Sequence, residues 1–535
     1  MGARPDDGGS AGASPVGPDL AVLSAGQRRI LAYASAIGPE FPFELLRDAM
    51  GVEEELLAEE LEELVRRGFL TEKPGGGAFC FVQEELRASV YRSMTESRHR
   101  LLHRKIAEVL ERGRCEPSSS LAAELGRHYF LGKVPSKSYV YNRRAAKLAR
   151  ERDEPSAAIP FLERALFDLP ALDGDHRRER AEVAEELGDL SYATGQYRTA
   201  DRYYALALDH LERDVPQVRA RLLLARAEVA RENLDDQAAT DGAMQALGIF
   251  EEVRDRVGAS QSYRLLGRVA FQEGRYRDAL EHGMRALDAL PADADGRVLG
   301  RLSIEIGNAF ALLGEEVRPI AIEWYERAVD RLRTSRDWVE LARALHNLGT
   351  IVGESRPLEG LELLDRAREV AERGHDSRGA GRCLLSGVEL RLAVGQLEEA
   401  ERDNVQAGRI LGRLADHLGL DLAAKNAGRI AERRGQWDDA AAAYARAIDI
   451  AQRYHLTAEE AEGQYCLAHL KFKTREFEEA RTALSRALEL GVAELSPRLA
   501  PAIAFLERQL GLTAATEASR RSPPDLPVGR ERPLA

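Results

Sequence analysis

Cysteine is scarce in this sequence of 535 residues. The four cysteines, Cys80, Cys115, Cys383 and Cys466, lie far apart, and none forms a CxxC pair. Zinc ribbons and disulfide frameworks both need cysteines at short, regular spacings. The spacing excludes both kinds of scaffold and predicts a chain that works in the reducing cytoplasm.

Long apolar runs are missing as well, and the chain has fewer positively charged than negatively charged residues. No stretch approaches the roughly 18 apolar residues that a membrane-spanning helix needs, so we expect no membrane insertion. The chain has 76 Lys and Arg residues against 89 Asp and Glu, which gives a net charge of −13. Phosphate contacts need a local excess of Lys and Arg, so the composition disfavours general nucleic-acid binding.

Signatures of catalysis are also absent from the sequence. It contains no GxxxxGK[ST] phosphate loop and no GxSxG nucleophile elbow. His99 and His103 stand four residues apart, so one helical face could present both to a metal ion, with His128 and Cys115 as further ligands. We favour the alternative, a packing helix with hydrogen-bonded histidines. The prediction is a protein that is not an enzyme, with no catalytic, cofactor-binding or metal-binding residues.

A repeat dominates the rest of the chain. A small residue, a second residue four positions on and an Ala three positions further recur nine times, and the last Ala advances by 42, 39, 40, 42, 39, 40, 40 and 40 residues. These spacings place the three residues on one helical stripe, where small side chains let a second helix approach closely. The copies are Ala158-Leu162-Ala165, Ala200-Tyr204-Ala207, Ala239-Ala243-Ala246, Ala279-Gly283-Ala286, Ala321-Tyr325-Ala328, Gly360-Leu364-Ala367, Ala400-Asn404-Ala407, Ala440-Tyr444-Ala447 and Ala480-Leu484-Ala487.

Two further signals accompany most copies. A small pair such as Leu187-Gly188 or Ile306-Gly307 lies about twelve residues upstream of the first small residue. A turn such as Gly195-Gln196-Tyr197 or Gly435-Gln436-Trp437 follows that pair and reverses the chain. Each unit is therefore expected to be a helical hairpin that buries its apolar face only by stacking on its neighbours.

The order of small pair, aromatic, Ala, aromatic, Ala and Pro resembles the tetratricopeptide repeat family over about residues 140–495. The resemblance implies an all-α protein, a tetratricopeptide-like right-handed α-solenoid of about nine repeats. The period near 40 exceeds the usual 34 and implies longer helices, as in the repeats of signal-transduction ATPases. The copies at 219–253 and 380–412 match poorly, and we expect them to be distorted. A plain helical bundle is the alternative.

Residues 21–93 predict a small winged-helix domain. A capping box at 24–27 opens the first helix, and further helices are expected at 41–50 and 52–67, before two short strands at 69–72 and 78–82. Leu56, Leu57, Leu61, Leu64 and Val65 are expected on one face of the third helix. That helix reads DNA in a typical winged helix, but here it carries seven glutamates. DNA binding is therefore disfavoured, although it stays open as an alternative.

A second resemblance covers about residues 22–170. Phe79-Cys80-Phe81-Val82-Gln83, Tyr91, Arg98, His103 and Leu125-Gly126-Arg127-His128-Tyr129 are similar to the stretch that follows the nucleotide-binding domain of large signalling ATPases. Those proteins include the LuxR-type large ATP-binding regulators and the adenylate-cyclase-associated ATPases, in which a winged helix links the ATPase to tetratricopeptide repeats. Gln83 stands where that family usually has His. Only a Gly- and Pro-rich stretch precedes Leu23, so ATP hydrolysis is not carried over.

The expected domain organisation follows from these signals. We predict a disordered tail at 1–20, the winged-helix domain at 21–93, a helical connector at 94–139 and the repeats at 140–496. A capping helix at 497–512 should turn Leu499, Ile503, Leu506 and Leu510 toward the last repeat. A Pro-rich disordered tail is expected at 513–535.

The predicted function is that of a non-catalytic scaffold or adaptor that binds a protein or peptide in the concave groove of the solenoid. The resemblance implies that the first helix of each repeat lines the groove, and a peptide with an acidic segment or a terminal carboxylate would pair with its basic residues. Solvated helix faces are the alternative interpretation. A transcriptional or signalling regulator with ligand-sensing repeats, acting with a separate ATPase chain, is the alternative function. The candidate groove residues are Arg264, Arg268, Phe271, Asn308, His346, Asn347, Lys425, Asn426, Arg429, Tyr465 and His469.

Overall fold

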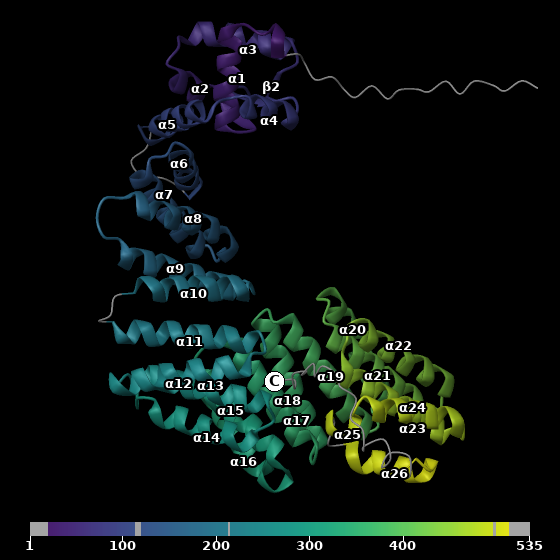
Figure 1. The fold of residues 1–535 in the computed structure, drawn as a ribbon. Coiled ribbons are helices and arrows are strands. Elements are labelled where there is room, and N and C mark those ends of the chain that lie inside the picture. The colour runs from purple at the N-terminus through teal and green to yellow at the C-terminus, as the bar shows by residue number, and fades with distance from the viewer. Residues whose placement is uncertain (1–19, 113–118, 212–214, 496–498, 513–535) are drawn as a thin grey trace, which may run out of the picture. The chain divides into compact units, whose positions relative to one another are not determined.

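The structure is a computed structural model that describes residues 20–112, 119–211, 215–495 and 499–512. Apart from Leu20, the predicted tails at 1–20 and 513–535 lie outside these residues. The chain divides into two compact units, Met1–Ala238 and Ala239–Ala535, which we describe separately. Figure 1 labels the helices and strands in the order of the chain. Helix α12 (Asp236–Glu252) crosses the boundary between them.

The first unit combines short strands with helices. Its elements are η1 (Leu20–Val22), α1 (Ala25–Ile37), β1 (Glu40–Pro42), α2 (Phe43–Met50), α3 (Glu54–Arg66), β2 (Leu70–Glu72), β3 (Ala78–Phe81), α4 (Glu84–Arg92), α5 (Glu96–Arg112), α6 (Ser119–Leu131), α7 (Pro135–Glu151), α8 (Pro155–Asp168), η2 (Leu169–Ala171), α9 (Arg177–Ala193), α10 (Tyr197–His210) and α11 (Pro216–Glu232).

The described part of the second unit is entirely helical. Its elements after α12 are α13 (Arg256–Gln272), α14 (Tyr276–Ala289), α15 (Gly296–Leu313), η3 (Glu315–Val317), α16 (Arg318–Arg333), α17 (Trp338–Gly353), α18 (Pro357–Arg373), α19 (Ser377–Ala393), α20 (Leu397–Arg413), α21 (His417–Arg433), α22 (Trp437–Arg453), α23 (Thr457–Lys473), α24 (Phe477–Glu489), α25 (Val492–Leu495) and α26 (Ala500–Leu510).

The N-terminal module, residues 21–93, has four α-helices, α1 to α4, and a three-stranded antiparallel sheet in the order β1-β3-β2. The predicted capping box is present, because the backbone N–H of Gln27 donates to Ser24 Oγ at 3.0 Å and that of Ser24 donates to Gln27 Oε1 at 3.1 Å. Strand β1 was not predicted. It is three residues long and ends in proline, and it pairs with β3 because Phe41 packs against Phe79 and Phe81. The winged-helix interpretation of this module stays a prediction.

Helix α3 buries a narrower stripe than its sequence predicts. Leu57, Leu61 and Leu64 are buried as expected, whereas Leu56 is 57% exposed. Successive residues of a helix point about 100° apart, so Leu56 lies beside this stripe instead of on it. The helix also exposes several glutamates, among them Glu55 and Glu59.

The core of the N-terminal module continues beyond residue 93. Leu102 and Ile106 of α5 belong to the same hydrophobic cluster as Leu31, Phe41 and Leu61. Helix α5, predicted as part of a connector, therefore shares a core with the module that precedes it.

The repeats form antiparallel helical hairpins, which confirms the tetratricopeptide-like solenoid fold. We call the first helix of each hairpin the A helix and the second the B helix; α13, α15, α17, α19, α21 and α23 are the A helices of the second unit. The final Ala of all nine sequence copies is 0% exposed. The turn glycines Gly195, Gly274, Gly395 and Gly435 have φ between 73° and 80°, a conformation that favours glycine. Helices of 17 residues, such as α19 to α23, account for the long period.

The two poorly matching copies are regular at the level of their helices, so the expected distortion was wrong. Helices α11, α12, α19 and α20 each run for 17 uninterrupted residues. In the copy at 380–412, Asn404 stands where six of the other eight copies have tyrosine or leucine. Its buried side-chain amide donates to the carbonyl of Ala423 at 2.9 Å. A hydrogen bond to the next hairpin thus takes the place of apolar packing.

The small pair of the A helix makes room for a tyrosine of the B helix. A Cβ atom added at Gly307 would lie 2.8 Å from Tyr325 Cε1, closer than real Cβ contacts. The Tyr325 hydroxyl donates to Asn308 Oδ1 at 2.8 Å. The same arrangement occurs at Gly188, where Tyr204 lies beneath the backbone and donates to Asp189. In these two repeats, the tyrosine of the B helix therefore packs directly against the upstream glycine of the A helix.

Replacing Gly307 with Ala is expected to lower the free energy of unfolding by about 1–2 kcal/mol, because overpacking outweighs the better helix propensity of Ala. Urea unfolding followed by tryptophan fluorescence measures the change. Gly408→Ala in α20 is the matched control, since nothing lies within 4 Å of its added Cβ. The control is expected to be neutral or stabilising. Equal effects of the two substitutions would contradict the packing argument.

The A helices of the second unit lie against one another in series. α13 contacts α15, α15 contacts α17, and the series continues through α19, α21 and α23. At the C-terminal end, Ile503, Leu506 and Leu510 of α26 pack with Leu484 and other residues of the last hairpin. This is the contact expected of a capping helix. The A helices thus form a continuous surface on which side chains of neighbouring hairpins meet.

Candidate functional site

Arginine–aspartate ion pairs join successive A helices at two junctions. In each, an aspartate caps the N-terminus of the later helix and forms ion pairs with two arginines of the earlier helix. Arg297 and Arg301 of α15 reach Asp337 at 3.3 and 3.0 Å. Arg378 and Arg382 of α19 reach Asp416 at 3.2 and 3.6 Å. We call these two arrangements the arginine locks.

Two of the predicted groove arginines are paired with carboxylates of the chain itself. Arg264 Nε lies 3.0 Å from Glu305 Oε1, and Arg429 forms an ion pair with Glu389. Each of these pairs joins one A helix to the next. An arginine that already pairs with a carboxylate of the chain binds an acidic group of a partner less strongly. These ion pairs therefore weaken the case for an acidic peptide.

Lys425 and Asn426 are buried, at 3% and 0% exposure, which argues against direct contact with a partner. Lys425 Nζ lies 2.7 Å from Asp421 Oδ2 and 3.2 Å from Glu462 Oε2. Burial raises the pKa of Asp421 to about 6, against the opposing effect of Lys425. Burial alone would lower the pKa of Lys425, but the carboxylates of Asp421 and Glu462 raise it. The cluster of Asp421, Lys425 and Glu462 therefore links α21 to α23.

Three predicted residues, Asn308, His346 and Asn347, meet in one hydrogen-bond chain. The Asn347 amide donates to Asn308 Oδ1 at 2.9 Å, and His346 Nδ1 lies 3.2 Å from Asn347 Oδ1. His346 Nε2 lies 2.9 Å from Ser386 Oγ. Burial lowers the pKa of His346, so the ring is neutral at pH 7. With Nδ1–H donating to Asn347, Nε2 accepts from the serine.

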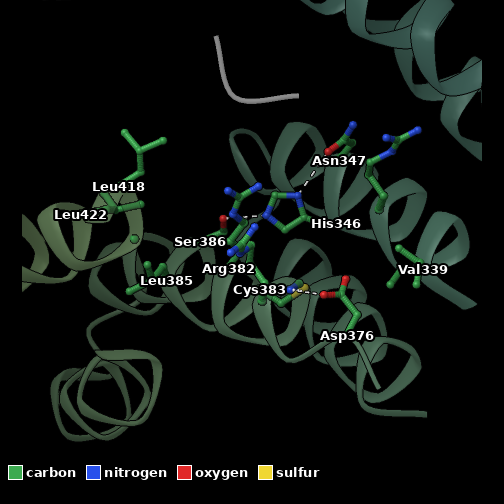
Figure 2. A pocket seen from close by; sticks show the side chains of 15 residues that line it. Val339, His346, Asn347, Asp376, Arg382, Cys383, Leu385, Ser386, Leu418 and Leu422 are labelled. Carbon is green, nitrogen blue, oxygen red and sulfur yellow. Dashed lines mark hydrogen bonds between the residues drawn. The ribbon is translucent and has the colours of Figure 1, made fainter. Parts of the chain in front are cut away.

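His346 and Asn347 also line a cavity of about 220 Å³ between α17, α19 and α21 (Figure 2). Figure 2 shows Val339 and Asp376 toward one end and Leu418 and Leu422 toward the other. The lining combines apolar side chains with arginines and a hydrogen-bonded rim. The full lining is Val339, Ala342, Arg343, His346, Asn347, Asp376, Arg378, Gly379, Arg382, Cys383, Leu385, Ser386, Leu418, Gly419 and Leu422. We call it the α17–α19–α21 cavity.

A second cavity, of about 500 Å³, gathers Arg429, Tyr465 and His469. The rings of Tyr465 and His469 are stacked with their centroids 6.2 Å apart. Burial lowers the pKa of His469. The remaining predicted residues, Arg264, Arg268, Phe271 and Asn308, line neither of these two cavities. Phe271 closes its own hairpin by an edge-to-face contact with Tyr276 at 5.4 Å.

Sequence reasoning missed the charged residues of the first cavity, namely Arg343, Asp376, Arg378 and Arg382. A signal was present, because Asp255, Asp295, Asp337, Asp376 and Asp416 recur at the repeat period. Each of these five side chains accepts a backbone N–H and caps its A helix. Aspartate is a favoured N-cap residue. The recurring aspartates mark the first turns of the A helices. The arginine locks and the α17–α19–α21 cavity lie beside these turns.

Three histidines of the first unit, His99, His103 and His128, lie in hydrogen-bond contacts between α4, α5 and α6. Arg127 Nη2 lies 2.9 Å from His128 Nε2, which must accept because arginine only donates. His128 Nδ1–H then donates to His103 Nδ1 at 2.9 Å, and His103 Nε2–H donates to the Tyr91 hydroxyl at 2.8 Å. His99 Nε2 lies 2.7 Å from the Tyr91 carbonyl. These contacts match the packing interpretation of His99 and His103. Cys115, the other ligand considered, lies outside the described residues.

Within the described residues, no group of three or more His, Cys, Asp or Glu side chains is arranged to hold a metal ion. In the same part of the chain, none of the helices has the length and apolar character needed to cross a bilayer.

The sequence matches no protein-family model and no curated protein. The structure is similar to the signal-transduction ATPase with numerous domains and a tetratricopeptide repeat sensor from Pyrococcus horikoshii, with 13% identity, a TM-score of 0.41 and coverage of 91% of this chain. This chain spans 66% of the length of that protein. It is also similar to aspartyl phosphate phosphatase F from Bacillus subtilis, with 16% identity, a TM-score of 0.42 and coverage of 74% of this chain and 96% of that one.

A third similar structure is a Rap protein complexed with competence and sporulation factor, with 17% identity, a TM-score of 0.41 and coverage of 75% of this chain and 98% of that one. In fold, the chain described here is a tetratricopeptide-like repeat protein.

Proposed function

We propose that this chain is a non-catalytic scaffold that binds a protein or peptide segment on the A-helix surface of its second unit. The observation that carries the proposal is the α17–α19–α21 cavity, which spans three successive hairpins. Its 220 Å³ is below the roughly 300–1,000 Å³ of pockets that enclose a small-molecule ligand. A cavity of this size suits one or two side chains of a longer partner.

The lining of the cavity also suits a peptide. Leu385, Leu418 and Leu422 provide an apolar surface, while His346 and Ser386 provide a fixed polar rim. Interfaces draw most of their affinity from a few anchors that enter such pockets, and the surrounding contacts exclude water. The rest of the partner would lie along the neighbouring A helices.

Selection of a random heptapeptide phage library on the immobilised full chain tests this proposal. We expect enriched peptides, and we expect Leu418→Trp to weaken their binding at least tenfold in fluorescence polarisation because the indole fills the cavity. Val257→Trp is the matched control: Val257 stands at the same position of α13, two residues after the capping aspartate, and is 47% exposed. Absence of enrichment, or equal binding to both variants, would overturn the proposed function.

A further inference from the structure

The arginine locks provide an internal comparison for the junction between α17 and α19. In both locks the arginines stand two and six residues after the aspartate that caps their own helix. The corresponding residues of α17, counted from Asp337, are Val339 and Arg343. Arg343 pairs with Glu340 of its own helix at 2.5 Å. The junction between α17 and α19 therefore has no lock, although locked junctions stand on both sides of it.

The aspartate that caps α19 at this junction is Asp376. Asp376 Oδ1 accepts the backbone N–H of Gly379 at 2.8 Å. Within the described residues, its carboxylate forms no ion pair. Asp376 lines the cavity and is half-buried, as Asp337 is, whereas Asp416 is buried. Figure 2 shows Asp376 at the Val339 end.

The other charges that line the cavity are already paired. Arg343 is held by Glu340, and Arg378 and Arg382 are held by Asp416. A partner carboxylate would have to break these ion pairs and would meet Asp376 nearby. A partner cation could instead pair with the carboxylate of Asp376. Val339, which stands at the position of the lock arginine, has a short side chain without charge and does not compete for that carboxylate. The balance of charge therefore favours a cation over the acidic group that the sequence suggested.

We propose that the α17–α19–α21 cavity binds an arginine or lysine side chain of a peptide partner through Asp376. The partner's cation takes the place that a chain arginine occupies in the two locks. An apolar residue next to it in the peptide packs toward Leu385, Leu418 and Leu422. This inference rests on the proposed function and names the chemistry of its anchor.

The heptapeptides enriched on the wild-type chain are the probes for this inference. We expect them to share Arg or Lys beside Leu, Ile, Met or Phe. Asp376→Asn is expected to weaken their binding by about 10- to 100-fold, the range of a charge-assisted hydrogen bond. Asparagine is also a good N-cap, so the variant keeps the start of α19.

Val339→Arg is the sharper variant, because it should complete the missing lock and exclude the peptide from within. We expect it to weaken peptide binding about as much as Asp376→Asn. Val257→Arg, at the same position of α13, is the matched control and should leave binding unchanged. A peptide in which citrulline replaces the enriched arginine should lose the dependence on Asp376.

The outcomes separate the two proposals. Enriched peptides that share Asp, Glu or a required free C-terminus would overturn the cationic anchor and leave the scaffold function standing. Basic peptides that bind Asp376→Asn as well as wild type would also overturn the anchor alone. Failure to enrich any peptide, or indifference to Leu418→Trp, would remove the proposed function and the anchor together.

Discussion

Lowering the pH from 7 to 4 is expected to reduce the free energy of unfolding of the first unit by about 3 kcal/mol through His103 alone. Burial lowers the pKa of His103 to about 3, with further lowering by Arg127 and His99. An unfolded histidine titrates near 6.5, so between pH 6.5 and 3 the unfolded chain binds a proton that the folded chain excludes. The stability is fully present above pH 6.5 and falls as the pH drops toward 3.

His128 adds to this loss in the same direction, because burial and Arg127 hold its pKa well below the usual value. The network leaves no place for an extra proton. His128 Nε2 accepts from Arg127, and a second proton on His103 would place an N–H against the His128 N–H. Tyr91 and His99 complete the groups that face the pair.

Urea unfolding at several pH values, followed by far-ultraviolet circular dichroism, measures this dependence. Tryptophan fluorescence serves as a separate reporter, since Trp324, Trp338 and Trp437 all lie in the second unit. The control carries His103→Gln and His128→Gln, which cannot titrate in this range. A variant that loses as much stability as wild type between pH 7 and 4 would assign the acid sensitivity to other groups.

Replacing Lys425 with Met is expected to cost about 3–5 kcal/mol of stability in the second unit, because it leaves a buried carboxylate without a counter-charge. Asp421 keeps only 1% of its side chain exposed, and Glu462 Oε2 lies 3.2 Å from the lysine Nζ. This substitution would also remove a residue that the sequence placed in the groove. The effect should nevertheless appear in folding and leave binding at the cavity intact in the folded fraction.

Urea unfolding followed by tryptophan fluorescence measures the loss. Adding Asp421→Asn to Lys425→Met should recover much of it, because the unpaired charge is removed. Lys473→Met is the surface control: Lys473 pairs with Glu432 at 3.0 Å but is 46% exposed, so less than about 1 kcal/mol is expected. A Lys425→Met variant as stable as this control would contradict the buried-pair argument.

Much of the fold could be predicted because its signals are short in range. The small-residue stripe, the glycine turns and the capping box each depend on residues within one helix or one turn. The burial of Ala165, Ala286 and Ala447 follows from spacings of three and four repeated at a fixed period. Strand β1 could not be predicted, because three residues carry no periodicity and Phe41 pairs with β3 through contacts that lie about forty residues away.

The candidate site was predicted only in outline. His346 and Asn347 lie at the first cavity and Arg429, Tyr465 and His469 at the second, since a position on the A helix follows from the repeat. Lys425 and Asn426 share that position yet are buried. A helical pattern identifies a face, but neighbouring hairpins decide which part of that face is covered.

The sequence by itself determined that this chain forms stacked helical hairpins, because local spacing and a constant period are enough to specify which residues each hairpin buries. Only the tertiary structure decided which charges meet. Arg378 and Asp416 pair across two A helices, while Asp376 forms no ion pair with any residue that the structure describes, and Val339 stands where the locks have arginine. Ion pairs depend on distances between side chains of different hairpins, and no one-dimensional pattern contains those distances.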